Sequence, residues 1–300
     1  MTDEYNEIFE YLMIDVNDQC HLRCKTCVKG VRAIPNTKKL LPLESFEKIL
    51  HKAKSDEIKK IALYSWTEPF LNQGLDKYTE LVKKNNFLCM VSSTLSIARI
   101  TNLEKALSNT DVLVISISGL DQETYEINHV GGKLEFVKKH IEEIALLKSD
   151  KKISTKVVLK FLKWDYNEHQ EQLARDYAKS MRFDFDVING SCHPLNNQIS
   201  PDFAHEMEVK IKDKMFGNSE TSDTYCPLIF NQISVNADGD VYQCCAHGYY
   251  DFMKHGSYLD LSMKEIFIQR INHPSCKVCD FPRNTYDELH KGIYNNFTKD

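Results

Sequence analysis

From residue 8 to about residue 188 the chain alternates short apolar segments with longer amphipathic ones, and this rhythm constrains its fold more than any other feature. The strand candidates are residues 8–16, 60–65, 87–93, 112–118, 155–162 and 183–188. Helix candidates lie between them at 43–54, 75–85, 102–108, 134–148 and 168–181. Successive strand–helix units predict a parallel sheet with right-handed crossovers. Because eight units close a full barrel, six predict an α/β fold built as a partial (β/α)6 barrel.

The helix candidate at 43–54 has one apolar face. Its apolar residues recur at three- and four-residue spacing, as a buried helical face requires: Phe46, Ile49, Leu50 and Ala53. Two polar pairs predict helix starts further along the chain. Thr101 with Glu104 predicts a capping box, and Asn167 with Gln170 predicts a similar pair.

After residue 188 the rhythm breaks. Residues 189–201 form a polar loop, and 202–215 is a charged helix candidate. Strand candidates at 229–235 and 240–244 flank the hairpin signal Ala237-Asp238-Gly239, and a helix candidate follows at 262–271. We therefore predict a core at 1–200, a linker with a helix at 201–222 and a small α+β domain at 223–300.

Composition narrows the class of protein. With 42% hydrophobic and 27% charged residues, the chain is typical of soluble globular proteins. Its net charge of -5 gives no reason to expect nucleic acid or an anionic membrane as partner. No apolar run approaches a membrane span, and residues 1–10 are acidic and polar, so a cytoplasmic location is predicted. In a reducing compartment, ten cysteines favour metal or redox chemistry over disulfides.

Three cysteines lie close together near the start, in the run Cys20-His-Leu-Arg-Cys24-Lys-Thr-Cys27. A closed structural zinc site needs four protein ligands, and the run has three thiols. An iron–sulfur cubane held by three thiolates keeps one iron free for an exogenous ligand. The alternative interpretation is a zinc knuckle or chance clustering.

The spacing C-x3-C-x2-C resembles the signature of the radical S-adenosylmethionine (SAM) enzymes, whose free iron chelates SAM. Later motifs resemble the family's in the same order. Residues 65–69 (Ser-Trp-Thr-Glu-Pro) resemble Gly-Gly-Glu-Pro, 92–94 (Ser-Ser-Thr) resemble Ser-Thr-Asn, and 116–119 (Ser-Ile-Ser-Gly) resemble Ser-Ile-Asp-Gly. The resemblance covers roughly residues 8–190.

The resemblance implies SAM contacts from five side chains: Thr67, Glu68, Ser93, Ser116 and His129. Glu68 and its neighbouring backbone would meet the methionyl ammonium, and Ser116 the ribose. His129 stands where the family usually has an arginine that contacts the SAM carboxylate. Without the resemblance, we would interpret Glu68 as a solvated acidic residue of a loop.

The resemblance also implies the chemistry. An electron from a donor such as flavodoxin or ferredoxin reduces a [4Fe–4S] cluster, and SAM is cleaved to methionine and a 5′-deoxyadenosyl radical. That radical removes a hydrogen atom from the substrate. The protein orients SAM, tunes the cluster and excludes water.

Four later cysteines form a possible second ligand set: Cys226, Cys244, Cys276 and Cys279. Their arrangement resembles the twitch domain, the short form of the SPASM domain, which holds one auxiliary [4Fe–4S] cluster. A four-cysteine zinc ribbon has similar spacing and stays the alternative.

Cys245 directly follows Cys244, one of these ligands. A residue at that position can face the substrate. A thiol there suits a hydrogen-atom donor, because an S–H bond is weaker than a C–H bond. Cys192 is a second candidate for this catalytic role, although free cysteines are commonly buried as small hydrophobes. Cys89, within a strand candidate, is expected in the core.

These features predict an oxidoreductase or epimerase that acts on a small polar substrate of the carbohydrate or aminocyclitol kind. Oxidation by two electrons and epimerisation both occur among similar twitch-type enzymes. Two alternatives remain. One is a maturase of a ribosomally made peptide, disfavoured because the cluster motif begins at residue 20 and leaves no room for an N-terminal peptide-recognition domain. The other is an iron–sulfur scaffold or electron carrier.

Overall fold

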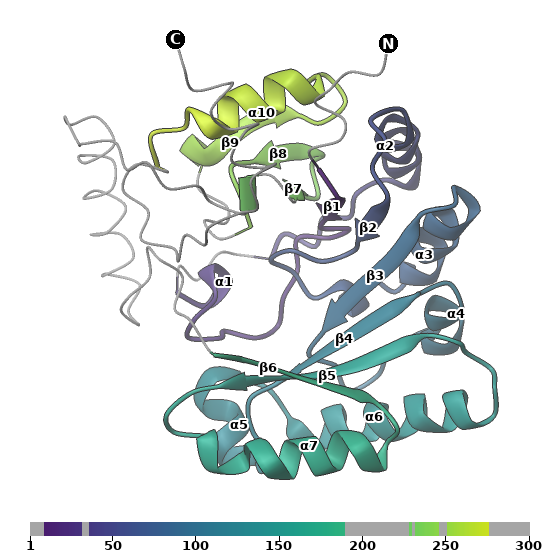
Figure 1. Cartoon of the computed structure of the whole chain (residues 1–300), viewed down its shortest axis with the longest axis vertical. Coiled ribbons are helices and arrows are strands. Elements are labelled where there is room, and N and C mark those ends of the chain that lie inside the picture. Colours follow the sequence, from purple (N-terminus) through teal and green to yellow (C-terminus); the bar gives the residue numbers. More distant parts are fainter. Residues whose placement is uncertain (1–8, 32–35, 190–227, 230–231, 246–250, 276–300) are drawn as a thin grey trace, which may run out of the picture.

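The computed structural model describes residues 9–31, 36–189, 228–229, 232–245 and 251–275. Within them, a single nine-stranded sheet runs in the order β6-β5-β4-β3-β2-β1-β7-β8-β9 (Figure 1). Its strands are β1 Tyr11–Ile14, β2 Lys60–Ala62, β3 Leu88–Ser93, β4 Val112–Ile117, β5 Lys156–Lys163, β6 Asp184–Asn189, β7 Gln232–Val235, β8 Asp240–Tyr242 and β9 Lys254–Ser257.

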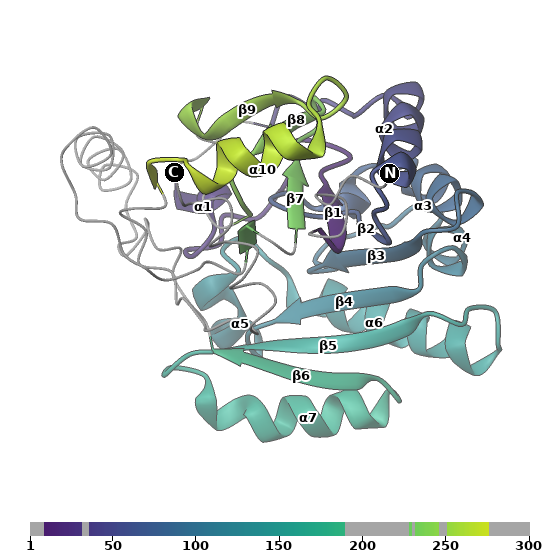
Figure 2. The same cartoon turned by 45° about the horizontal axis from the view of Figure 1, so that its top comes forward.

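The first six strands are all parallel and lie in chain order, each beside the next. Five helices of this part alternate with the strands: α2 Leu43–Ser55, α3 Leu75–Lys84, α4 Leu103–Ser108, α6 Leu134–Ser149 and α7 Glu171–Ser180. The helices lie on the outer side of a curved sheet (Figures 1 and 2). This arrangement confirms the predicted α/β fold with a partial (β/α)6 barrel.

The hydrophobic core fills the space between the sheet and these helices. The predicted apolar face of α2 is buried there, with Phe46 and Leu50 fully inaccessible. Strand residues alternate between the core and the inner, concave face of the sheet. In β4, Leu113, Ile115 and Ile117 enter the core, so Ser116 belongs to the concave face. Polar side chains on the concave face are therefore available to the site.

The chain after the barrel extends the same sheet. β7 pairs in parallel with β1, and β8 and β9 follow as antiparallel neighbours (Figure 2). The predicted turn joins β7 to β8, and Gly239 has φ +86°, a left-handed conformation that glycine adopts without strain. α10, Met263–Ile271, begins with a capping box between Ser262 and Glu265. The predicted domain boundary falls in residues outside the described ranges and stays a prediction.

The helices expected at 102–108 and 168–181 begin within one residue of their predicted starts, but both predicted side-chain caps are wrong. α4 begins after Asn102, which has φ 56°, and neither a Thr101 nor an Asn102 side chain caps it. Asn167 bonds its amide group to the Ser118 and Leu162 carbonyls and so does not cap the short helix η3, Glu168–Gln170. The Asn102 side-chain amide donates instead to Asp76, and neither this contact nor those of Asn167 can be identified from sequence spacing.

Several short elements were not predicted: α1 Val28–Val31, η2 Pro69–Leu71, α5 Gln122–Asn128, η4 Asp251–Met253 and β9. Within the described residues, no helix is long and apolar enough to cross a membrane.

Candidate functional site

The three clustered cysteines occupy the loop between β1 and α1, at the carboxyl edge of the sheet. The loop is tight: the Cys27 amide donates to the Cys24 carbonyl at 3.1 Å, and the Gly30 amide donates to the Cys27 carbonyl at 2.9 Å. A Cβ atom on Gly30 would lie 2.1 Å from the Cys24 carbonyl oxygen. Only glycine therefore fits at this position without moving the cysteine loop.

The cysteine loop docks on the segment that follows α5. The amides of Arg23 and Lys25 donate to the carbonyls of Val130 and Asn128, at 3.0 and 3.2 Å. The Thr26 hydroxyl donates to the Asn128 side-chain oxygen at 3.1 Å. These contacts fix the loop over the carboxyl ends of the strands, where ligands of parallel sheets bind.

The chemistry of the three thiols fits an iron–sulfur cluster. Burial raises the pKa of Cys20 to about 12. Burial also raises the pKa of Cys24, and the adjacent Cys27 and Cys20 sulfurs raise it further, so the sulfurs lie within electrostatic reach of one another. Neighbouring thiolates in such surroundings need a bound cation to be stable.

Among the described residues, no three His, Cys, Asp or Glu side chains are arranged as ligands of a single metal ion. A cubane binds its thiolates on separate irons.

Glu68 is a buried carboxylate held in one orientation. It accepts hydrogen bonds from the Ser93 hydroxyl at 2.7 Å and from the amide and hydroxyl of Thr94 at 3.1 and 3.0 Å. Its own amide donates to the Gln19 carbonyl, at the start of the cysteine loop. The structure thus brings together Glu68 and Ser93, which the sequence predicts as SAM contacts from different strands.

Asp15 organises the loop before Glu68, and sequence analysis did not identify it. This buried carboxylate follows β1 and accepts from the Ser65 amide at 2.9 Å, the Trp66 amide and the Thr67 hydroxyl at 2.6 Å. Thr67 therefore anchors the loop to β1. The sequence does contain a signal for this residue, since Asp15 is a single acidic residue at the carboxyl end of an apolar strand.

His129 is buried within the segment on which the cysteine loop docks, between Asn128 and Val130. Its Nδ1 lies 2.6 Å from the Ser118 hydroxyl, and its ring stacks on Tyr125 with centroids 4.7 Å apart. Burial lowers the pKa of His129 to about 4, so the ring is neutral at neutral pH. A contact between His129 and the SAM carboxylate stays a prediction, and a neutral ring would have to make it.

No protein-family model matches the chain. Among curated proteins it is similar to the GTP 3′,8-cyclase of Pelotomaculum thermopropionicum, with 31% identity over 120 residues, which are 39% of this chain and 36% of the cyclase. The chain thus spans little more than a third of that relative's length.

Among solved structures, the fold is similar to that of Streptococcus suis SuiB bound to S-adenosylmethionine, with a TM-score of 0.62 and 16% identity over 96% of this chain and 68% of SuiB. It is also similar to BtrN in complex with AdoMet and 2-DOIA, with a TM-score of 0.54 and 15% identity over 93% of this chain and 97% of BtrN. The resemblance to the radical SAM enzymes is confirmed. At these identities the structural likeness establishes the fold.

Beyond the barrel, only part of the second cysteine set lies within the described residues. Cys244 is buried just after β8. Cys192, Cys226, Cys276 and Cys279 lie outside the described residues, so their predicted roles stay predictions. Cys89 is buried in β3, as expected for a core residue.

Cys245 contacts β7. Its sulfur accepts a hydrogen bond from the Gln232 amide, whose side-chain oxygen accepts from the Tyr11 hydroxyl. Burial raises the pKa of Tyr64, and the neighbouring Cys245 sulfur raises it further. This thiol therefore also lies near Tyr64, just after the end of β2. The pairing of β7 with β1 thus carries a cysteine from the later part of the chain to the barrel.

Arg270 fixes the chain next to Cys244. The guanidinium is fully buried and donates to the carbonyls of Gln243 and Leu228, each at 2.7 Å, and of Ile229 at 3.3 Å. α10 is thereby tied to the residue that precedes Cys244. Sequence analysis gave no signal for this role, because the arginine lies in an ordinary helical pattern.

Proposed function

We propose that this chain is a radical SAM enzyme in which Cys20, Cys24 and Cys27 hold a [4Fe–4S] cluster that binds SAM. The observation that carries the proposal is the docking of the cysteine loop over the strand ends that bear Glu68 and Ser93. Three thiolates would leave one iron of a cubane without a protein ligand, and that iron could bind a small molecule. When bound, the cluster and SAM supply the oxidising radical that removes a hydrogen atom from the substrate.

The side chains of the chain bind and orient SAM in this proposal. Glu68 accepts four hydrogen bonds, from the Ser93 hydroxyl, the Thr94 amide and hydroxyl and the Phe70 amide, which fill the about four lone-pair sites of a carboxylate. The longest of them, from the Phe70 amide at 3.3 Å, is the one that a SAM donor would replace. Glu68 would accept from the methionyl ammonium, while Thr67 holds the adjoining backbone in place. Ser116 on the concave face would contact the ribose, and His129 would contact the SAM carboxylate as a neutral ring.

A second [4Fe–4S] cluster on Cys226, Cys244, Cys276 and Cys279 completes the proposal. The substrate would be a small polar molecule of the carbohydrate or aminocyclitol kind, and the outcome epimerisation or two-electron oxidation. Cys245, and less directly Cys192, would return the hydrogen atom in an epimerisation. An external donor such as flavodoxin or ferredoxin would supply electrons.

The first experiment removes the cysteine loop's ligands. Anaerobically reconstituted protein should hold about eight irons per chain, as two cubanes require. Replacing Cys20, Cys24 and Cys27 with Ala should halve the iron and abolish formation of 5′-deoxyadenosine from SAM. Cys89→Ala is the matched control, because this core thiol lies in β3 and should leave the iron content unchanged. If the triple variant still forms 5′-deoxyadenosine, the proposal is wrong.

The second experiment addresses the auxiliary cluster. Replacing Cys276 and Cys279 with Ala should remove about four irons and keep the first cluster. About one zinc per chain in native protein, with only about four irons, would instead establish the zinc ribbon. Faster 5′-deoxyadenosine formation with a precursor peptide than with any small polar compound would favour the peptide maturase. SuiB is a structural neighbour solved with its precursor peptide SuiA.

A further inference from the structure

The concave face of the sheet carries a row of polar side chains of which only Ser116 is a proposed SAM contact. Parallel pairing sets Ser116 of β4 opposite Lys160 of β5, and Lys160 opposite Asp186 of β6. The chain neighbours of Lys160 and Asp186 lie in or against the hydrophobic core: Leu159, Phe161, Phe185 and Val187. Because successive strand residues point to opposite faces, Lys160 and Asp186 point away from that core. The row therefore lies on the concave face, level with Ser116.

Lys160 and Asp186 are opposed without being hydrogen-bonded to each other. Their Nζ and Oδ2 atoms lie 3.9 Å apart, beyond hydrogen-bond range, and the two side chains are 30% and 50% exposed. An ammonium offers three donors and a carboxylate about four acceptor sites. Both groups therefore keep capacity for a ligand that inserts hydroxyl or amino groups between or beside them.

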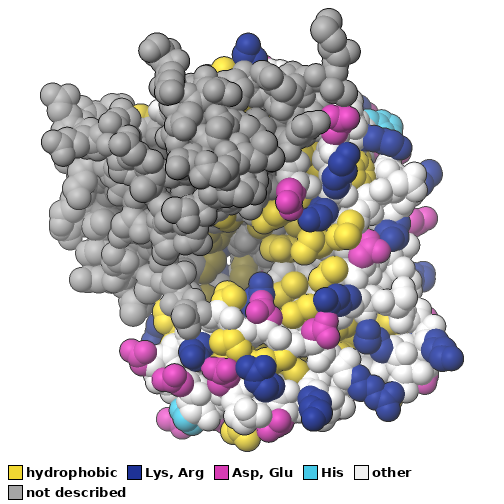
Figure 3. Space-filling model, viewed as in Figure 1, with side chains coloured by type: hydrophobic (Ala, Val, Ile, Leu, Met, Phe, Trp, Pro, Cys, Tyr) yellow, Lys and Arg dark blue, Asp and Glu magenta, His cyan; other side chains and the backbone are white. Residues whose placement is uncertain are grey.

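The two cross-strand ion pairs on this face are balanced in charge. A second cross-strand pair, Lys156 with Asp184 at 3.2 Å, lies nearer the amino ends of the same strands. Together the two pairs contribute two positive and two negative charges, and Figure 3 shows both signs close together on a hollowed face. A triphosphate needs a surplus of cationic donors, which these two pairs do not provide.

We infer that Lys160 and Asp186 bind the substrate, and that this substrate is a small polyol, neutral or bearing an amino group, rather than a nucleoside triphosphate. The inference rests on the proposed function, because Ser116 at the same level is the proposed ribose contact. Asp186 accepts from a hydroxyl or ammonium group, and Lys160 donates to a hydroxyl oxygen.

The test is calorimetric titration of reconstituted, SAM-loaded protein with a panel of monosaccharides, amino sugars, cyclitols and aminocyclitols, and separately with GTP. At least one panel compound should bind, and more tightly than GTP. Lys160→Met and Asp186→Asn should each weaken that binding about tenfold or more, as the loss of a charged hydrogen bond does. Asp186→Asn should weaken the binding of amino compounds more than the binding of their hydroxyl counterparts. A merely structural role of Asp186 would not produce this difference.

Lys156→Met and Asp184→Asn are the matched controls, since they remove a similar pair from the same face further from the cysteine loop. They should leave binding within about twofold of wild type. Urea unfolding midpoints identify any variant that folds poorly, and Lys160→Gln then replaces Lys160→Met.

Preferred binding of GTP, no binding by any panel compound, or equal weakening in the control variants would overturn the inference. The titration measures binding and needs no turnover, so it tests the inference even if 5′-deoxyadenosine never forms. A lack of 5′-deoxyadenosine would contradict only the proposed function.

Discussion

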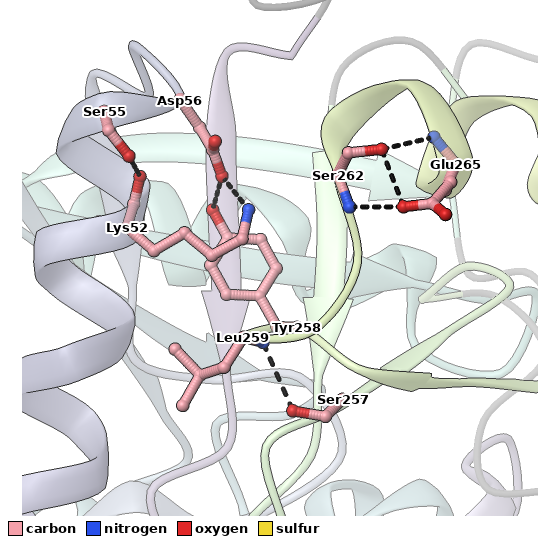
Figure 4. A network of polar contacts seen from close by, with 8 residues as sticks. All are labelled: Lys52, Ser55, Asp56, Ser257, Tyr258, Leu259, Ser262 and Glu265. Atoms are coloured by element: carbon pink, nitrogen blue, oxygen red, sulfur yellow. Dashed lines mark hydrogen bonds and ion pairs between the residues drawn. The ribbon is translucent and has the colours of Figure 1, made fainter.

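The Tyr258 hydroxyl donates a 2.7 Å hydrogen bond to Asp56, a residue 202 positions earlier in the chain (Figure 4). Asp56 also pairs with Lys52, whose ammonium lies 4.4 Å from the centroid of the Tyr258 ring. Tyr258 is fully buried. This contact ties the segment between β9 and α10 to α2 of the barrel.

Tyr258→Phe should lower the free energy of unfolding by roughly 1.5–3 kcal/mol, the range for a hydrogen bond to a charged group. The ring stays, so packing is kept and only the hydroxyl is lost. Tyr177→Phe is the matched control, because its buried hydroxyl has no hydrogen-bond partner among the described residues. It should be neutral or slightly stabilising. Urea unfolding measures both, and equal effects would contradict the role of Asp56.

Gly30→Ala should disrupt the cysteine loop. Its Cβ would lie 2.1 Å from the Cys24 oxygen and 2.6 Å from the Arg23 carbonyl carbon, and both are backbone atoms that the loop cannot move independently. Iron per chain should fall by about four, and 5′-deoxyadenosine formation should be lost. Gly74→Ala is the control, because its nearest contact would be 3.5 Å to an Asn72 side-chain oxygen. Normal iron in Gly30→Ala would show that the loop tolerates a wider path.

Stability should decrease as pH falls from about 6.5 towards 4, because of the buried His129 and the half-buried His255. Burial lowers the pKa of His129 to about 4; burial and then the nearby His273 and Arg270 charges lower that of His255 to about 4. In this range the unfolded chain binds protons that the folded chain does not, at up to roughly 1.4 kcal/mol per pH unit per histidine.

Unfolding midpoints measured across this pH range test the linkage. His129→Gln should flatten the dependence relative to wild type, whereas His51→Gln, at an exposed position of α2, should leave it unchanged. The same slope in His129→Gln as in wild type would show that His129 titrates normally in the folded protein.

Cys245 separates the two proposed reactions. If its thiol donates a hydrogen atom to the substrate radical, a C–H bond forms and the sulfur is left as a thiyl, which an electron from the external donor and a solvent proton restore. In deuterated water the epimer should then carry deuterium at the inverted carbon. Cys245→Ala should still form 5′-deoxyadenosine but release no epimer. A fully active Cys245→Ala enzyme whose carbonyl product carries no deuterium would establish oxidation instead.

The sequence predicts the barrel strands and the longer helices well, but it misses several short helices. α2 and α6 run through three or more turns, so their apolar spacing is repeated often enough to identify them. α5 has seven residues and depends on Asp121, whose side chain accepts from the Thr124 amide. At α4 the expected cap at Thr101 failed, because Asn102 turns the chain in a left-handed conformation.

By itself, the sequence determined what is local in the chain: the spacing of Cys20, Cys24 and Cys27, and the order of strands and helices in the barrel. Such features depend on neighbours a few residues apart, which the sequence contains directly. Only the tertiary structure decided which distant residues meet. Glu68 reaches Ser93 and Thr94, and Lys160 faces Asp186, because parallel strands align in one register. That register is set by the packing of the whole sheet, which no local pattern specifies.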